Sequence, residues 1–323
     1  MRNILQLLLL ISVVFILGGC GFTKQIVGEY YLDEKKYDRG ESHFRKRVSE
    51  NPNSAEANYY YGRFLLAKNK ATQALPYIQK AIELDSKKSI YHSWLGVTYA
   101  FLKKPQLEKE AYLKALKLDE NNIQALTYLA HNYYEKKEYK KALEKYNKVL
   151  KISSTNQYAL YNRASTLKRL KRIPEEKNAW LEYLEYYPSG SFARNAVKNL
   201  NKMNNYEYKN HLIGFKTITL KNIEFTPFTS DITKESKPSL DVLGKILTEN
   251  KKISIHIIAY QLNNKTLAKQ KAIEIKKYIL KNNKKIDSKR LKLSWFDQSK
   301  KFKIGRKNFI QNETIDFITV VNK

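Results

Sequence analysis

The first two-thirds of the chain carry apolar and small residues that return every 34 positions. A small residue occupies one column, at Gly28, Gly62, Gly96, Ala130 and Ala164. Three residues later stand Tyr31, Leu65, Tyr99, Tyr133 and Leu167, and thirteen residues after those stand Phe44, Ile78, Tyr112, Tyr146 and Trp180. A fixed period of this length indicates a stack of similar helix pairs that bury one continuous core.

The period and the small–aromatic order resemble the tetratricopeptide repeat, whose unit has this length. The resemblance implies an α-helical solenoid over residues 20–205, with units at about 21–54, 55–88, 89–122, 123–156 and 157–190. Residues 191–205 place Phe192, Ala196 and Leu200 at helical spacing and are polar elsewhere. This stretch is expected to be a capping helix that closes the last apolar face.

The resemblance also implies a concave groove lined by the first helix of each unit, and a non-enzymatic role in protein binding. The groove positions are Tyr59, Arg63, Phe101, His131, Tyr134, Tyr158, Tyr161, Lys168 and Arg169. Aromatic side chains beside cations suit an extended or helical peptide with some acidic character. The alternative for each tyrosine is that it only packs between repeats.

After Asn205 the apolar pattern changes to a period of two, which is typical of strands. Strands are expected at 215–225, 253–260, 290–296 and 313–321, with helices from about Pro238 and over 267–280. This β-α-β-α-β-β order predicts a small α+β domain at 212–323.

The same region resembles the OmpA-like peptidoglycan-binding domain. Residues 264–272 (NKTLAKQKA) are similar to the family signature N-x-x-L-S-x-x-R-A, and residues 312–317 (NETIDF) to its closing strand. The chain departs from the family at the peptidoglycan-binding site. The loop before Asn264 is short and lacks the Asp that binds the stem peptide in the family. Lys271 stands in place of the signature Arg, and Glu313 and Thr314 stand in place of the paired Arg residues of the closing strand. Lysine keeps the charge but lacks the two-pronged geometry of arginine. We therefore expect the fold to persist and wall binding to be lost or altered.

The positive charge of this region suggests a second way in which it could bind a partner. Residues 263–307 hold sixteen Lys or Arg against three acids. Such a field favours a polyanion, peptidoglycan included, with strong salt dependence. The candidate residues are Asn264, Lys271, Lys276 and Lys277. The alternative is that these lysines form an ordinary solvated surface.

The single cysteine, Cys20, follows a short apolar run. Arg2 precedes the apolar residues 4–17, and Gly18-Gly19-Cys20 follows them. This arrangement resembles the lipobox of bacterial lipoproteins, which implies a signal peptide at 1–19 and acylation of Cys20. Alternatives are an ordinary cleaved signal and an N-terminal membrane anchor, although the apolar run is short for a span. Gly21 lacks the Asp that retains related lipoproteins at the inner membrane, so an outer-membrane, periplasm-facing location is expected, with surface display left open.

Composition narrows the function further. The formal net charge of +29 would suit nucleic acid, but the expected export argues against that partner. His92 is expected in the core and His131 in the groove without a second ligand at metal spacing, and no phosphate-binding loop or nucleophile motif appears. We therefore expect no cofactor, no metal and no catalysis. The first hypothesis is an envelope adaptor that binds proteins, and the second is a wall or polyanion anchor.

Overall fold

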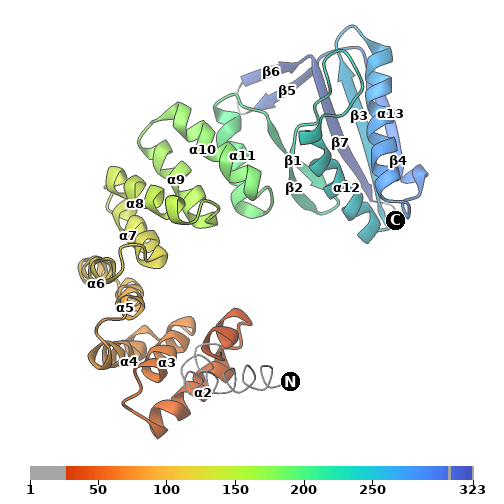
Figure 1. Ribbon diagram of the computed structural model, residues 1–323. Coiled ribbons are helices and arrows are strands. Elements are labelled where there is room, and N and C mark those ends of the chain that lie inside the picture. Colours follow the sequence, from red (N-terminus) through yellow and green to blue (C-terminus); the bar gives the residue numbers. More distant parts are fainter. Residues whose placement is uncertain (1–26, 305–306, 322–323) are drawn as a thin grey trace, which may run out of the picture. The chain divides into compact units, whose positions relative to one another are not determined.

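A computed structural model describes residues 27–304 and 307–321 of the chain (Figure 1). Cys20 and the expected signal peptide lie outside the described residues. The chain divides into two compact units, residues 1–159 and 160–323, and the division falls within helix α9 (Gln157–Arg169). None of the described helices combines the length and the apolar character that crossing a membrane requires.

Unit 1 is built of helix pairs that repeat with the period of the sequence pattern. Residues 27–33 are helical and precede α2 (Tyr37–Glu50). The following helices are α3 (Ala55–Ala67), α4 (Ala71–Leu84), α5 (Ser89–Phe101), α6 (Pro105–Leu118), α7 (Ile123–Glu135) and α8 (Tyr139–Ile152). The first helices of the pairs begin at 55, 89 and 123, and the second helices at 71, 105 and 139. Each pair therefore begins 34 residues after the preceding pair.

The turn inside each pair has one recurring geometry. Backbone φ is positive at the same position of successive repeats, namely at Lys35, Asn69, Lys103, Lys137 and Lys171. At the end of α7, the Lys137 amide donates to Tyr134 O at 2.9 Å and the Glu138 amide donates to Tyr133 O at 2.8 Å. This pair of bonds is the Schellman motif, which satisfies carbonyls that a helix end leaves free.

The small-residue column is where the two helices of a pair come closest. A Cβ atom added to Gly96 of α5 would lie 2.3 Å from the ring of Tyr112 in α6, and Tyr112 is fully buried. In the next pair Ala130 and Tyr146 occupy the corresponding positions, and both are fully buried. The ring thus fills the volume that the small residue leaves, and this contact sets the distance between the helices.

Unit 2 begins with helices and continues into sheets. The helices α10 (Ile173–Tyr186) and α11 (Gly190–Lys202) follow α9, and α11 covers most of the residues at which a capping helix is expected. The remaining elements are β1 (Tyr208–Ile213), β2 (Lys216–Lys221), α12 (Lys237–Glu249), β3 (Ile253–Gln261), α13 (Lys265–Asn282), β4 (Leu291–Phe296), β5 (Lys300–Ile304), β6 (Lys307–Gln311) and β7 (Glu313–Val321).

A three-stranded sheet with the order β4-β3-β7 forms the centre of this part. Strand β3 runs parallel to β4 and antiparallel to β7, so that Ile257 faces both Leu293 and Phe317. Helix α13 packs on β3 and β4, and α12 packs on α13. The core includes Leu243, Ile257 and Ile275, all fully buried.

The expected strand order is correct in part. The strands and helices predicted near 253–260, 267–280, 290–296 and 313–321 are present, whereas the strand expected at 215–225 is shorter and belongs to the hairpin β1–β2. The hairpin β5–β6 was not expected. The alternation in its sequence is short, because Phe302 and Ile304 alternate with lysines in β5 whereas Phe309 and Ile310 are adjacent in β6.

Replacement of Gly96 by alanine is expected to destabilise the solenoid. The added methyl group forces Tyr112 out of its position, and overpacking of this kind costs about 1–3 kcal/mol. This cost is at least as large as the gain of about 1 kcal/mol for removing a glycine from a helix. Urea unfolding followed by circular dichroism measures the change. Lys114→Ala, at an exposed position of α6, is the control and should leave the midpoint unchanged. An equal or higher midpoint for Gly96→Ala would show that the helices have room to separate.

At Lys137, which has positive φ, replacement by glycine is expected to stabilise the protein. Lys137→Gly should stabilise the protein by up to about 1 kcal/mol, because glycine adopts positive φ without the steric cost that a side chain brings. The neighbouring Lys136 has φ of −78° and is also exposed. Lys136→Gly therefore serves as the matched control and should be neutral or destabilising. If both glycines have the same effect on thermal unfolding, the backbone angle is not the cause.

Candidate functional site

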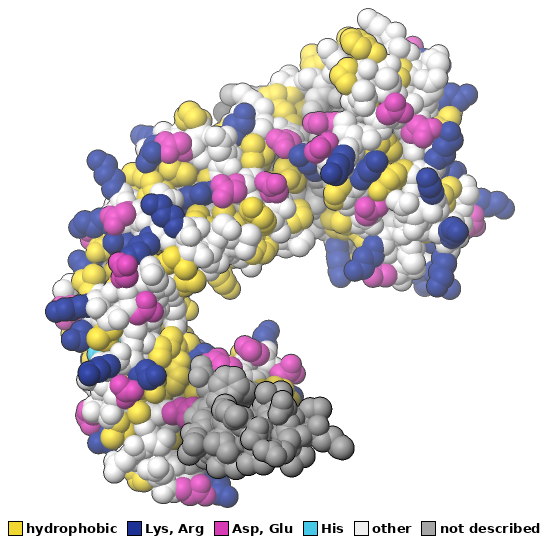
Figure 2. Space-filling view, in the orientation of Figure 1, with side chains coloured by type: hydrophobic (Ala, Val, Ile, Leu, Met, Phe, Trp, Pro, Cys, Tyr) yellow, Lys and Arg dark blue, Asp and Glu magenta, His cyan; other side chains and the backbone are white. Residues whose placement is uncertain are grey.

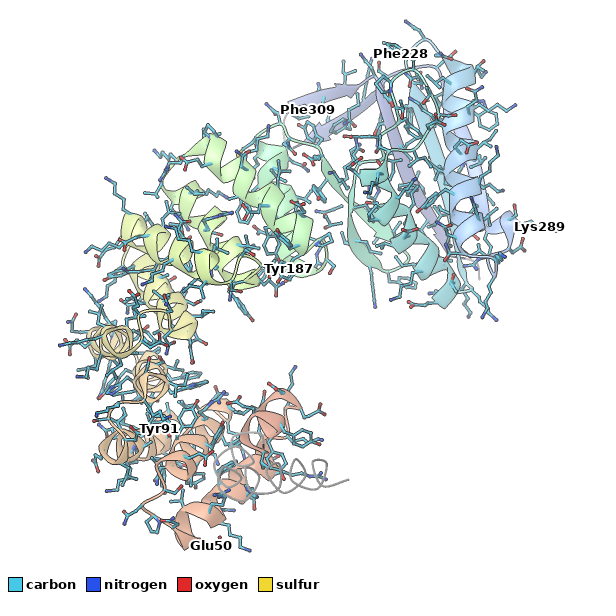
Figure 3. All side chains as sticks on the ribbon, in the orientation of Figure 1. Glu50, Tyr91, Tyr187, Phe228, Lys289 and Phe309 are labelled. Carbon is cyan, nitrogen blue, oxygen red and sulfur yellow. The ribbon has the colours of Figure 1, made fainter. Side chains whose placement is uncertain are left out.

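A pocket with a volume of about 650 Å³ lies in unit 1, where the first helices of successive pairs meet. It is lined by Glu29, Glu56, Tyr59, Tyr60, Arg63, Lys88, Ile90, Tyr91, Trp94 and Gln124. Most of these residues belong to α3 and α5, and Tyr91 is labelled in Figure 3. The pocket brings together two of the expected groove residues, Tyr59 and Arg63.

Arg63 is the centre of this pocket. Its guanidinium carbon lies 4.4 Å from the ring centroid of Trp94 and 5.4 Å from that of Tyr59. Cations are attracted to the faces of aromatic rings at such distances. Only 12% of the Arg63 side chain is exposed, and its Nε has no hydrogen-bond partner among the described residues.

A carboxylate from the preceding repeat of the same unit neutralises the charge of Arg63. Arg63 Nη1 donates to Glu29 Oε1 at 2.5 Å, and the Tyr60 hydroxyl donates to the same oxygen at 3.0 Å. Glu29 and Arg63 stand one full period apart, so they occupy the same position of successive repeats. The stacking of the repeats therefore creates the ion pair.

The pocket is electrically balanced, and four of its ten lining residues are aromatic. Arg63 and Lys88 are offset by Glu29 and Glu56. Burial raises the pKa of Tyr91 to about 12 and raises that of Tyr59 as well, so both phenols stay neutral. A surface of this kind suits an apolar or aromatic side chain of a partner more than the acidic peptide that the cations alone had suggested.

The other expected groove residues lie outside this pocket. In unit 1, Phe101 and Tyr158 are exposed by 50% and 61%, and His131 is also exposed. The ring of Tyr134 packs against Tyr139 at 5.4 Å between centroids. These positions belong to the same face of the first helices but form no part of the pocket.

Three further groove residues belong to unit 2. The ring of Tyr161 stacks on Phe192 at 4.4 Å and meets Trp180 edge-on at 5.2 Å, so it packs between helices. Lys168 Nζ donates to Asn199 Oδ1 at 2.5 Å, and Arg169 is exposed.

Sequence reasoning missed several residues of the pocket although their column was visible. Glu56, Ile90 and Gln124 follow one another at the repeat period and share their position with Tyr158. Extending that column backward from Tyr158 would have found them. Trp94 and Tyr91 belong to no groove column, and only the packing of α3 on α5 brings them to the pocket wall.

Lys271 was the main candidate in the strand-rich part of unit 2, and its ammonium already has internal partners. Its side chain is 2% exposed, and Nζ lies 2.7 Å from both Gln261 Oε1 and Glu313 Oε1. The ammonium also lies 4.8 Å from the ring centroid of Phe225. A residue with these contacts is part of the core of the domain.

The remaining candidates of this region also make internal contacts. Asn264 caps α13 by accepting a hydrogen bond from the Leu267 amide at 2.9 Å. Lys276 Nζ donates to Leu291 O at 2.8 Å, and Lys277 pairs with Glu274 at 2.8 Å. Lys277 remains largely exposed, and Figure 2 shows Lys and Arg side chains spread over the visible face of this region. Within the described ranges, no group of three or more His, Cys, Asp or Glu side chains is placed to hold a metal ion.

Comparison with known proteins identifies the repeats. Models of the tetratricopeptide repeat match residues 28–89, 91–122 and 130–171. Over 91 residues the chain is 37% identical to the human (Homo sapiens) protein O-mannosyl-transferase TMTC3 and 33% identical to the mouse (Mus musculus) superkiller complex protein 3. These alignments cover 27% of this chain and 10% and 6% of those proteins, so the chain spans a tenth or less of their length.

Solved structures agree with this result at the level of the fold. Pseudomonas aeruginosa PilF matches with a TM-score of 0.51 at 16% identity, covering 56% of this chain and 82% of PilF. A chain of the Cut9–Hcn1 hetero-tetramer of the APC/C matches with a TM-score of 0.51 at 17% identity, covering 57% of this chain and 36% of that one. Repeats of this kind typically form non-enzymatic scaffolds for protein binding. The helical part of this chain is a tetratricopeptide-repeat solenoid followed by a small region of sheets.

Proposed function

We propose that the protein is a lipid-anchored adaptor of the bacterial cell envelope that captures a partner protein on the solenoid. It would hold an envelope assembly together and carry out no catalysis itself. The pocket around Arg63 is the observation that carries this proposal, because it offers aromatic walls and balanced charge on the face that such solenoids use for binding.

The pocket favours a peptide with one apolar or aromatic anchor. The partner's side chain would pack against Ile90 and Trp94, which are both partly exposed. Glu56 and Lys88 at the pocket lining would contact the peptide backbone or its polar side chains. A buried anchor surrounded by polar groups is the usual arrangement of an interface with a small number of dominant residues.

Photo-crosslinking tests where a partner binds. A benzoyl-phenylalanine placed at Gln124, in the pocket lining, should yield a discrete protein adduct in membranes that contain the full-length protein. The same crosslinker at Lys114, an exposed position of α6 outside the pocket, should yield none. Trp94→Ala should lower the yield at Gln124 at least about ten-fold, since loss of a dominant aromatic residue of an interface typically costs about 2 kcal/mol or more and about 1.4 kcal/mol is already a factor of ten in affinity. Adducts of equal yield at both positions, or no effect of Trp94→Ala, would contradict binding in this pocket.

The membrane attachment rests on Cys20 and its resemblance to a lipobox. Two acyl signals hold a protein on a bilayer stably, since each buried CH₂ contributes about 0.8 kcal/mol. In this proposal the protein lies at the outer membrane and faces the periplasm.

Cys20→Ser separates lipidation from the alternatives. The variant should lose the acyl mass and leave the detergent phase for the aqueous phase in Triton X-114 partitioning, whereas the wild type stays in the detergent phase. An ordinary cleaved signal would place both proteins in the aqueous phase, and a membrane-spanning anchor would keep both in the detergent phase.

The strand-rich part of unit 2 is, in this proposal, a divergent OmpA-like module. The order of α12, β3, α13 and β4 and the antiparallel β7 support that assignment. Binding of peptidoglycan is the second candidate function of the protein, and the exposed lysines around Lys277 favour an electrostatic form of it. The contacts of Lys271 argue against the arginine-type clamp of the family, because Glu313 occupies the place of a ligand carboxylate.

A further inference from the structure

A second cavity lies in unit 2, at the strand β7, and has a volume of about 420 Å³. Side chains of α11, β1, β5, β6 and β7 and of the segment between α11 and β1 line it, among them Tyr206, Lys209, His211, Lys300, Phe302 and Asp316. Successive residues of a strand point to opposite faces. Because Glu313 of β7 reaches Lys271 of α13, Thr314 and Asp316 point to the other face of the sheet, where the cavity lies.

The ammonium group of Lys209 lies at this cavity, and its hydrogen-bond acceptors are not carboxylates. Its Nζ donates to Gln311 Oε1 at 2.8 Å and to Thr314 Oγ1 at 2.7 Å, and both acceptors are neutral. The one acid of the lining, Asp316, forms its ion pair with Lys300. The lining therefore carries one positive charge that no side chain of the lining balances.

The environment of Lys209 disfavours its charge. Burial lowers the pKa of Lys209 to about 8, while Asp316 raises it and Lys300 lowers it further. Burial also lowers the pKa of His211 to about 4, so this ring is neutral at pH 7 and adds no charge. A buried cation is stabilised when an anion approaches it.

Two further polar atoms in the lining have no partner. The Tyr206 hydroxyl and Asn201 Oδ1 are both inaccessible to solvent and make no hydrogen bond with any described residue. Buried polar atoms normally have a hydrogen-bond partner, so such atoms at a cavity indicate a place for a ligand. The Tyr206 ring is held edge-on against Phe302 and Phe309, at 5.5 Å and 5.3 Å between centroids. Phe309 is labelled in Figure 3.

We propose that this cavity binds a small organic carboxylate, with Lys209 as its charge partner and the Tyr206 hydroxyl as a second donor. The apolar body of the ligand packs against Phe302. A single unbalanced cation and aromatic walls suit a monoanion with an apolar body better than phosphate, which carries more charge and no apolar surface. The contrast with Lys271 supports this assignment, because Lys271 has the same kind of amide partner and receives its carboxylate from Glu313.

Isothermal titration calorimetry on the full-length protein in detergent tests the proposal, with benzoate and phenylacetate as probes. Saturable binding of one carboxylate per chain is expected at ligand concentrations below about 10 mM. Benzamide has the same shape without the charge and should bind at least about ten-fold more weakly, which corresponds to about 1.4 kcal/mol. Inorganic phosphate should not compete with benzoate.

Variants assign the binding to this cavity. Lys209→Met keeps a long side chain without the charge and should weaken benzoate binding at least about ten-fold. Tyr206→Phe removes only the hydroxyl and should weaken it several-fold. Lys301→Met, next to Lys300 but exposed and outside the cavity lining, is the control and should bind as the wild type. Thermal unfolding of each variant verifies its fold, and Tyr206→Phe remains decisive if Lys209→Met does not fold.

The pH profile gives a readout that loss of packing would not produce. Affinity for benzoate should fall as the pH rises through about 8 and above, because deprotonation of Lys209 removes the cation. The other titratable groups at the cavity are the ion pair of Lys300 with Asp316, the neutral ring of His211, and Tyr206, whose pKa burial raises. No saturable binding of either carboxylate, equal binding of benzamide, preferred binding of phosphate, or unchanged affinity in both Lys209→Met and Tyr206→Phe would each overturn the proposal.

Discussion

The close approach of the two helices in each repeat is the constraint on which unit 1 depends. At Gly96 the ring of Tyr112 occupies the volume of a side chain, so the helices cannot move closer and cannot separate without leaving a cavity. The same column holds Gly62 against Ile78. The small residue of the first helix has to face the second helix for this contact to form, so the contact fixes the rotation of the first helix and decides which of its residues face the groove. The ion pair of Glu29 with Arg63 exists because two such helices stack with the same rotation.

The repeat was readable from the sequence because one physical requirement returns at a fixed spacing. The spacing of α3, α5 and α7 follows from the period, since each of these helices starts 34 residues after the one before. The left-handed turn between the helices of a pair could not be predicted from the sequence, because lysines such as Lys103 and Lys137 occupy a position where glycine or asparagine is usual. The two backbone hydrogen bonds of the turn and the solvation of the lysine side chains outweigh the strain of positive φ there.

The candidate sites were harder to predict because they depend on pairs of residues rather than on single positions. Arg63 was visible as a cation of the groove, but its neutralisation by Glu29 depends on how far one repeat rotates against the next. In the same way, Lys271 and Glu313 each appeared as a separate departure from the OmpA-like pattern. The structure shows that they form one ion pair across α13 and β7. Only the register of β7 on β3, which pairs Gln261 with Glu313, brings all three polar groups to one point.

This ion pair also decides what wall binding would require. A stem-peptide carboxylate that approached Lys271 would have to displace Glu313, whose side chain is 43% exposed and can move into water. Lys271 cannot follow, because its own side chain is 2% exposed and its stem is packed in the core. During the exchange its ammonium would keep only Gln261 and the face of Phe225, and a buried charge without its counter-ion is strongly destabilising. The exchange therefore yields little net binding energy, since one carboxylate replaces another. Any affinity of this domain for the wall has to come from contacts that Glu313 does not already make, and exposed lysines of α13 such as Lys277 offer such contacts.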